Sequence, residues 1–129
     1  MTIDNLQLKM KDNVIKIKSF EFAVQVVNLY KHISTQKNEF VLSKQLLRSG
    51  TSVGAMIREA EHSESTLDFI HKLAIAQKEI NETIYWLELL HQTDYLDQDV
   101  FHKMNDEATS IIKLLTAIIK TTKRKLSKK

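Results

Sequence analysis

Apolar residues recur along most of the chain at spacings of three and four, the period that places side chains on one face of an α-helix. Between residues 19 and 36 they form two neighbouring stripes, which predict one helix with a broad buried face. The first stripe contains Phe20, Ala23, Val27 and Tyr30, and the second contains Phe22, Val26, Leu29 and Ile33. Residues 1–18 have scattered apolar side chains without a clear period, so we expect a mixed leader before this helix.

A second helix is expected to begin at Ser43, a good N-cap candidate, and it contains both glycines of the chain, Gly50 and Gly54. A glycine inside a helix costs about 1 kcal/mol relative to alanine, so a packing contact should offset that cost. The seam of this helix contains Leu46, Gly50, Val53, Ile57 and Ala60. We therefore predict that a neighbouring helix packs closely against the glycines. A phosphate-binding glycine loop would need a preceding strand, and the pattern before Gly50 is helical.

Two further helices follow in the pattern. The third begins at a capping box of Ser65 and Asp68, and its expected core stripe is Phe69, Leu73, Ala76, Ile80, Ile84 and Leu87. The fourth begins after a candidate cap, Asp97, with a heptad of Phe101, Met104, Ala108, Ile111, Leu115, Ile118 and Thr122. Four amphipathic helices with short connections predict an all-α fold, an antiparallel up-down four-helix bundle, in a single domain over residues 1–129.

The third helix has more apolar residues than its core stripe requires. Trp86, Leu89 and Leu90 lie off that stripe, and Trp86 is expected roughly opposite it. Such a surplus is typical of a helix with a second interface. Together with the broad face of the first helix, it predicts self-association through Trp86, Leu89, Leu90, Phe22 and Val26.

The formal charge of +3 is distributed unevenly along the chain. Residues 49–119 have a balance of −7, whereas residues 120–129 contain six basic groups and no acidic group. This basic tail is either a solvated helix end or a nucleic-acid-binding element. The candidate nucleic-acid-binding residues are Lys120, Lys123, Arg124, Lys125, Lys128 and Lys129, with Arg48 and Arg58 as alternatives.

Catalytic and metal-binding patterns are weak in this chain. Without cysteine it has neither disulfides nor thiolate chemistry. Two Glu-x-x-His pairs, Glu59 with His62 and Glu88 with His91, would lie roughly 30 Å apart along the bundle at 1.5 Å per residue, too far for one metal cluster. We therefore expect no enzyme activity, no metal and no cofactor. Neither a signal peptide nor an apolar run of about 20 residues is evident, so we expect a cytoplasmic protein without membrane contact.

Two segments resemble the 23S rRNA-intervening sequence protein family. They are SGTSVGAMIREA at residues 49–60 and the K-E…E-T…Y-W-L-E-L-L pattern at residues 78–90. The resemblance implies small antiparallel four-helix bundles that assemble into ring-shaped homopentamers. Some members are encoded inside intervening sequences of bacterial ribosomal RNA genes. Others resemble the accessory bundle protein of diversity-generating retroelements, which works with a reverse transcriptase and binds nucleic acid through a basic surface. Members usually have Asn where this chain has Met56.

Two functional hypotheses remain open from the sequence. The first is an oligomeric accessory protein that binds RNA or DNA, in which five copies would together present about thirty tail cations. The alternative is an oligomeric scaffold that binds another protein, such as a reverse transcriptase, while the tail only improves solubility.

Overall fold

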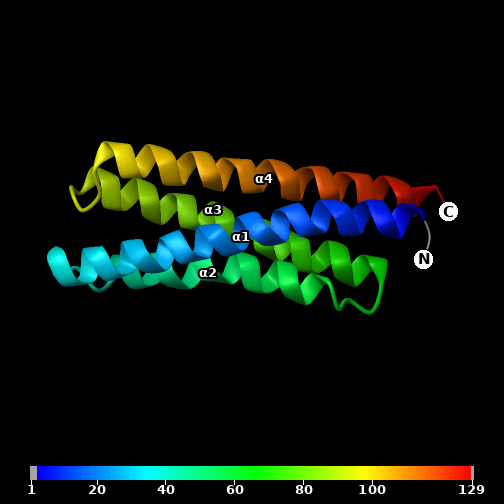
Figure 1. The fold of residues 1–129 in the computed structure, drawn as a ribbon, viewed down its shortest axis with the longest axis horizontal. Coiled ribbons are helices and arrows are strands. Elements are labelled where there is room, and N and C mark those ends of the chain that lie inside the picture. The colour runs from blue at the N-terminus through cyan, green and yellow to red at the C-terminus, as the bar shows by residue number, and fades with distance from the viewer. Residues whose placement is uncertain (1–2, 129) are drawn as a thin grey trace.

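The structure is a computed structural model that describes residues 3–128 of the 129-residue chain, with side chains from residue 14 onward. These residues form four helices and no strand: α1 (Ile3–Gln36), α2 (Leu42–Ala60), α3 (Thr66–Gln92) and α4 (Gln98–Ser127). The all-helical prediction is confirmed. Figure 1 shows that each helix runs in the opposite direction to the one before it, and that both chain ends lie at one end of the molecule. Within the described part, α1 and α3 each pack beside α2 and α4 and not beside each other.

The expected leader is wrong, because α1 already begins at Ile3 rather than near Ser19. Ile15 is fully buried, whereas its neighbours Val14 and Ile17 are 48% and 59% exposed. Apolar side chains therefore lie on opposite sides of this part of α1. A helix that is apolar on two opposite sides does not show the single stripe by which an amphipathic helix is identified.

The core lies where most of the predicted stripes meet. The second stripe of α1, the α2 seam and the α4 heptad from Met104 to Thr122 are all buried. By contrast, Phe20 in the first α1 stripe is 53% exposed. The buried face of α3 also differs from the prediction, since Phe69 and Ile84 are only half-buried. Its buried residues are Ile70, Leu73, Ala76, Ile80, Thr83, Leu87 and Leu90.

The glycines of α2 face α1 closely, as predicted. A Cβ atom added to Gly50 would lie 2.8 Å from both Cγ atoms of Val26. One added to Gly54 would lie 3.4 Å from the carbonyl oxygen of Ser19. The missing side chains therefore let the two helix backbones approach each other, which is the contact that offsets the low helix propensity of glycine.

The predicted cap of α2 is wrong, because Ser43 lies inside the first turn and the N-cap residue is Val41, whose side chain makes no capping bond. Glu39, two residues earlier, caps the helix instead. The Glu39 carboxylate accepts hydrogen bonds from the amides of Val41, Leu42 and Ser43 at 3.0, 2.8 and 2.8 Å. The Ser43 hydroxyl donates to the Glu39 carbonyl oxygen at 2.7 Å. Glu39 reaches this position because Asn38, two residues after the end of α1, takes a left-handed conformation with φ of 55°. The free amides of the helix start are thereby satisfied.

The expected starts of α3 and α4 are confirmed. Ser65 Oγ accepts from the Asp68 amide at 3.0 Å, although the Asp68 carboxylate reaches the amide of Glu64, at 3.2 Å, rather than that of Ser65. Asp97 accepts from the Val100 amide at 2.9 Å. Between the two helices, Asp94 has a φ of 69°, and the next amide donates to the carbonyl oxygen of Leu90 at 2.9 Å. This arrangement is a Schellman motif that ends α3.

Candidate nucleic-acid interface and subunit surfaces

The basic tail is helical rather than frayed, because α4 extends to Ser127. Thr122 is buried and Leu126 packs against the core, so the last turns of α4 are held against the bundle. Lys120, Arg124 and Lys128 are exposed and are spaced four residues apart, which places them on one face. We call these three residues the α4 ridge. Successive ridge residues are separated by about 6 Å along the helix axis.

The other predicted tail cations lie in different environments. Lys123 is exposed on a neighbouring side of α4, and Lys125 is half-buried. Lys129 lies outside the described residues. The ridge therefore contains three of the six candidate tail residues, and Lys123 adds a positive charge on the neighbouring side of α4.

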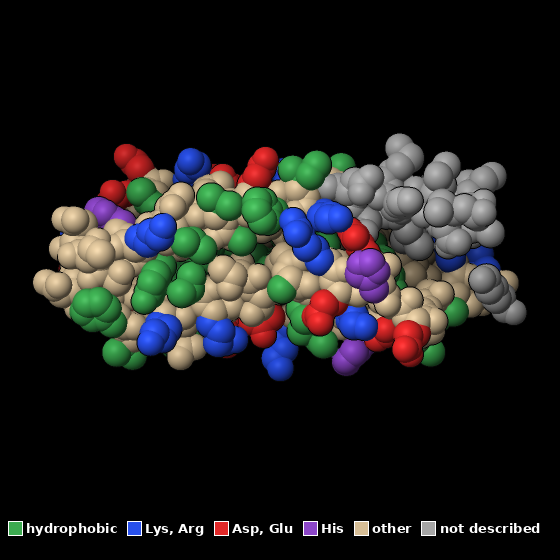
Figure 2. Space-filling model, turned by 60° about the horizontal axis from the view of Figure 1, so that its bottom comes forward, with side chains coloured by type: hydrophobic (Ala, Val, Ile, Leu, Met, Phe, Trp, Pro, Cys, Tyr) green, Lys and Arg blue, Asp and Glu red, His purple; other side chains and the backbone are tan. Residues whose placement is uncertain are grey.

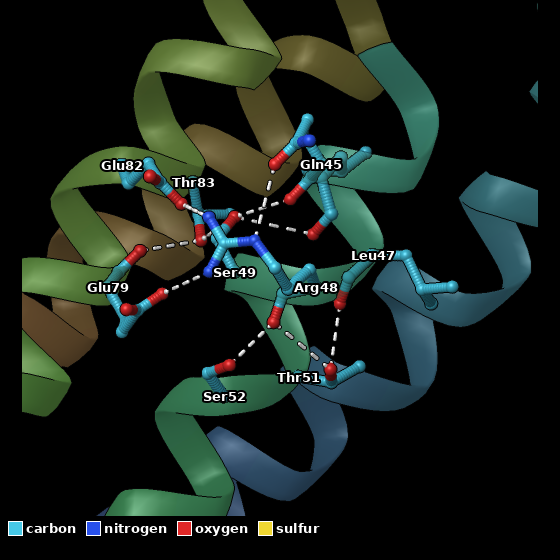
Figure 3. Close-up of polar contacts among 10 residues, drawn as sticks. Gln45, Leu47, Arg48, Ser49, Thr51, Ser52, Glu79, Glu82 and Thr83 are labelled. Carbon is cyan, nitrogen blue, oxygen red and sulfur yellow. Dashed lines mark hydrogen bonds and ion pairs between the residues drawn. The ribbon is translucent and has the colours of Figure 1, made fainter. Parts of the chain in front are cut away.

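The structure does not bring Arg48 together with the tail. Its guanidinium group contacts Glu79 at 3.4 Å, also contacts the Glu82 carboxylate, and donates from Nε to Gln45 at 3.2 Å (Figure 3). Two carboxylates of α3 therefore offset its charge. Arg58 is exposed, with its guanidinium carbon 5.1 Å from the centre of the Phe20 ring. Both arginines are on α2, which does not touch α4 within the described residues.

A buried pair of hydroxyl groups lies beneath this ion-pair network. Thr83 donates to Ser49 Oγ at 3.0 Å, and Ser49 donates to the carbonyl oxygen of Gln45 at 3.0 Å (Figure 3). Both side chains are fully buried, so the link fixes α2 against α3 without leaving a polar atom unsatisfied. The sequence does not reveal this hydrogen bond, because Thr83 is a polar residue at a buried position of α3, where an apolar residue is expected. Met56, on the same helix as Ser49, is half-buried and packs against the core.

Three of the predicted subunit contacts are wrong. Phe22, Val26 and Leu90 are buried inside the single chain, where no partner can reach them. Trp86 and Leu89 are half-buried on α3. Trp86 lies on the flank of the helix rather than opposite the core, since its Nε1 atom is buried. This atom has no hydrogen-bond partner among the described residues.

The unforeseen apolar surface lies on α1. Val14, Ile17, Phe20 and Val24 are between 44% and 59% exposed, and we call them the α1 outer face. Figure 2, which views the α1 and α2 side of the molecule, shows apolar side chains gathered between Lys and Arg side chains. One sequence feature could have indicated this surface: Val14 and Ile17 do not continue the spacing of the buried stripe that contains Phe22 and Val26.

Two cavities and the acidic residues offer little for chemistry. One cavity of about 220 Å³ lies between α1 and α4, with Glu21, Asp106 and Glu107 in its wall. The other, of about 330 Å³, lies at the α3–α4 turn beside His32 and Lys37. Among the described residues, no group of three or more His, Cys, Asp or Glu side chains could hold a metal ion.

The ionisable groups with shifted pKa values serve helix ends. Burial alone would raise the pKa of the Glu39 carboxyl. The hydrogen bonds from the amides of Leu42, Ser43 and Val41 and from the Ser43 hydroxyl lower it by more, so the net pKa lies below 4.5. The hydrogen bond from Lys72, followed by that from the Glu64 amide, lowers the pKa of Asp68. These shifts stabilise local structure and do not mark a reactive centre.

The fold and surfaces define a four-helix protein with a cationic helix end and an apolar outer face. No helix segment in the described residues is both long and apolar enough to cross a membrane. The sequence profile of the family described as 23S rRNA-intervening sequence protein matches residues 11–117, and the chain belongs to that family.

One solved relative supports this assignment. It is a protein of unknown function from the S23 ribosomal protein family of Bacteroides thetaiotaomicron, 59% identical in sequence. The match covers 85% of this chain and 98% of the relative, with a TM-score of 0.84. No protein with a curated description matches the chain.

Proposed function

We propose that this protein is a non-enzymatic, cytoplasmic accessory protein that binds RNA or DNA as a homo-oligomer of antiparallel four-helix bundles. The observation that carries the proposal is the α4 ridge. It presents Lys120, Arg124 and Lys128 at regular intervals on a helix that Leu126 holds against the core. The sequence contains no acidic residue after Glu107, so α4 has no carboxylate near the ridge that could offset its positive charge.

A regular row of cations suits the phosphate backbone, which attracts positive charge irrespective of base sequence. The same ridge repeated in an oligomer would bind with higher avidity than one copy alone. The family resemblance implies a pentamer, and the family name refers to ribosomal RNA, which favours RNA as the first ligand to test. The helix α1 begins, and α4 ends, at the end of the molecule where the ridge lies (Figure 1).

The test is a binding titration across a salt series with labelled single-stranded RNA and duplex DNA. The variant Lys120→Gln/Arg124→Gln/Lys128→Gln removes the ridge, and Lys31→Gln/Lys44→Gln/Lys103→Gln removes three exposed charges elsewhere. We expect the ridge variant to lower the salt slope by about 2 for RNA and by about 2.7 for DNA per binding subunit. Equal binding by the two variants, or no binding by the unmodified protein at low salt, would contradict the proposal.

A second candidate is an oligomeric scaffold that binds another protein, such as a reverse transcriptase, and no nucleic acid. The α1 outer face favours it, because four exposed apolar side chains on one helix are typical of a protein-binding surface. A stable oligomer without measurable nucleic-acid affinity at low salt would select this candidate over the first.

A further inference from the structure

A cavity lies at the end of the bundle where α1 finishes and the chain turns from α3 into α4. Its volume is about 330 Å³, which is within the range of roughly 300–1,000 Å³ that is typical of small-molecule sites. The apolar part of its wall is formed by Leu29 and Leu96, which are buried, and by Tyr95 and Val100, which are half-buried. The α4 ridge is at the opposite end of the molecule (Figure 1). The cavity is therefore separate from the proposed nucleic-acid interface.

The polar part of the wall has basic and acidic side chains on two different elements. His32 and Lys37 come from α1 and the residue that follows it, whereas Asp94 and Asp97 come from the α3–α4 turn. All four side chains are exposed. Among the described residues, no ion pair joins the basic side to the acidic side. Groups of both signs are therefore available to a ligand that enters the cavity.

Backbone contacts fix the acidic side of the cavity. Asp97 accepts a hydrogen bond from the Val100 amide at 2.9 Å, which anchors its side chain through one carboxylate oxygen. Asp94 has a φ of 69°, and the Tyr95 amide donates to the carbonyl oxygen of Leu90 at 2.9 Å, so the turn that contains Asp94 is held in one conformation. A site with prearranged polar groups loses little conformational entropy when a small molecule binds.

The charges of the wall favour a ligand that has both signs. An anion alone would be attracted by Lys37 but repelled by Asp94 and Asp97, and a cation alone would meet the reverse arrangement. A molecule with one carboxylate and one ammonium group can form charged hydrogen bonds to both sides at once. The apolar wall favours an aliphatic remainder, because burial removes hydrocarbon surface from water.

We propose that this cavity binds a free α-amino acid with an aliphatic side chain. The carboxylate of the amino acid binds the Lys37 ammonium group and the His32 imidazole, which can donate a hydrogen bond in either protonation state. Its ammonium group binds the carboxylates of Asp94 and Asp97. The proposal concerns binding and involves no reaction. It goes beyond the proposed nucleic-acid function and does not depend on it.

The first test is isothermal titration calorimetry of the full-length protein with L-leucine and two analogues. The analogue 4-methylpentanoate lacks the ammonium group and isopentylamine lacks the carboxylate, while both keep the branched hydrocarbon. We expect one L-leucine molecule to bind per chain. Each analogue should bind at least about tenfold more weakly, because a charged hydrogen-bonded contact is lost. No binding of L-leucine, or an analogue that binds as tightly, would overturn the proposal.

The second test locates the site with variants that remove one charge each. Lys37→Gln removes the cation, and Asp94→Asn removes a carboxylate but keeps a residue type that tolerates a left-handed backbone. The control Lys31→Gln/Asp99→Asn removes the same kinds of charge at exposed positions outside the cavity wall. We expect each cavity variant to bind L-leucine about tenfold more weakly, whereas the control should bind it as tightly as the unmodified protein.

Circular dichroism melts would verify that all of these variants are folded. Equal L-leucine affinity in the cavity variants and the control would overturn the proposed site. Both cavity variants should bind RNA as the unmodified protein does, because the α4 ridge lies at the opposite end of the molecule. A failure of the amino-acid proposal is thereby distinguished from a failure of the nucleic-acid proposal.

Discussion

The close approach of α1 and α2 at Gly50 makes a prediction about two chemically identical substitutions. Gly50→Ala should destabilise the protein, whereas Gly54→Ala should leave its stability unchanged or increase it. Alanine gains about 1 kcal/mol over glycine in a helix interior at either position. The outcome therefore depends on the space available for the added methyl group.

The distances give the magnitude of each effect. The Gly50 Cβ would lie 2.8 Å from both Val26 methyl carbons, whereas carbon atoms prefer separations of about 3.5–4.0 Å. Valine in a helix has one strongly preferred rotamer, so Val26 cannot rotate away cheaply. Overpacking of this kind costs about 1–3 kcal/mol. After the propensity gain, we expect a net loss of about 1 kcal/mol at Gly50. At Gly54 the nearest atom, Ser19 O, is 3.4 Å away, which is ordinary contact.

Thermal and urea unfolding of both variants, at matched protein concentration, would measure the difference. A gap of about 2 kcal/mol between them corresponds to roughly 8 °C in Tm for a chain of this length. Val26→Ala removes both methyl carbons and leaves only its Cβ, 3.2 Å from the added carbon, so in that background the cost of Gly50→Ala should disappear. If Gly50→Ala were stabilising in the unmodified protein, or if Val26→Ala left its effect unchanged, the close-packing argument would be refuted.

Three further predictions concern helix ends and the polar network. Glu39→Gln should lower the free energy of unfolding at pH 7 by about 1–2 kcal/mol, because the charged cap is lost. The hydrogen bonds of the cap hold the folded-state pKa of Glu39 below 4.5, so its contribution is complete above pH 4.5 and is lost as the pH falls through the folded-state pKa. The difference in urea stability between the two proteins should therefore shrink steadily as the pH is lowered below 4.5. Asp94→Ala should lower the free energy of unfolding by about 1 kcal/mol because φ is positive at this position, whereas Asp94→Gly should not lower it. Coinciding melting curves of the two variants would contradict the role of this backbone conformation. Arg48→Ala should cost less than about 1 kcal/mol and lose its effect at high salt, because the ion pairs are exposed; a large, salt-independent loss in urea titrations would contradict that reading.

Much of the fold could be predicted because α2 and α4 each have one dominant apolar stripe. The α2 seam and the α4 heptad lie in the core as expected, and Ser65 and Asp97 cap their helices as expected. The helix α1 was predicted less well because it is apolar on two opposite sides. Local periodicity cannot tell which of two stripes faces the core, so Phe20 was expected in the interior and Val26 at a subunit contact.

The candidate surfaces were harder to predict because they depend on which helices are neighbours. The tail cations were identified from composition, but their arrangement as a ridge depends on α4 continuing to Ser127. Arg48 was a candidate ligand for nucleic acid until its contacts with Glu79 and Glu82, more than thirty residues away in sequence, became visible. Glu39 could not be predicted as a cap because it lies two residues before the N-cap position, Val41, whereas a capping side chain is expected at the N-cap itself.

The most direct test of the central claim combines light scattering with RNA binding on the same sample across a salt series. The account predicts an oligomer that binds single-stranded RNA at low salt, releases it as salt rises, and loses most of this binding in the Lys120→Gln/Arg124→Gln/Lys128→Gln variant while keeping its mass. An oligomer of unchanged mass that binds RNA equally well with and without the α4 ridge, or that binds none at low salt, would contradict it.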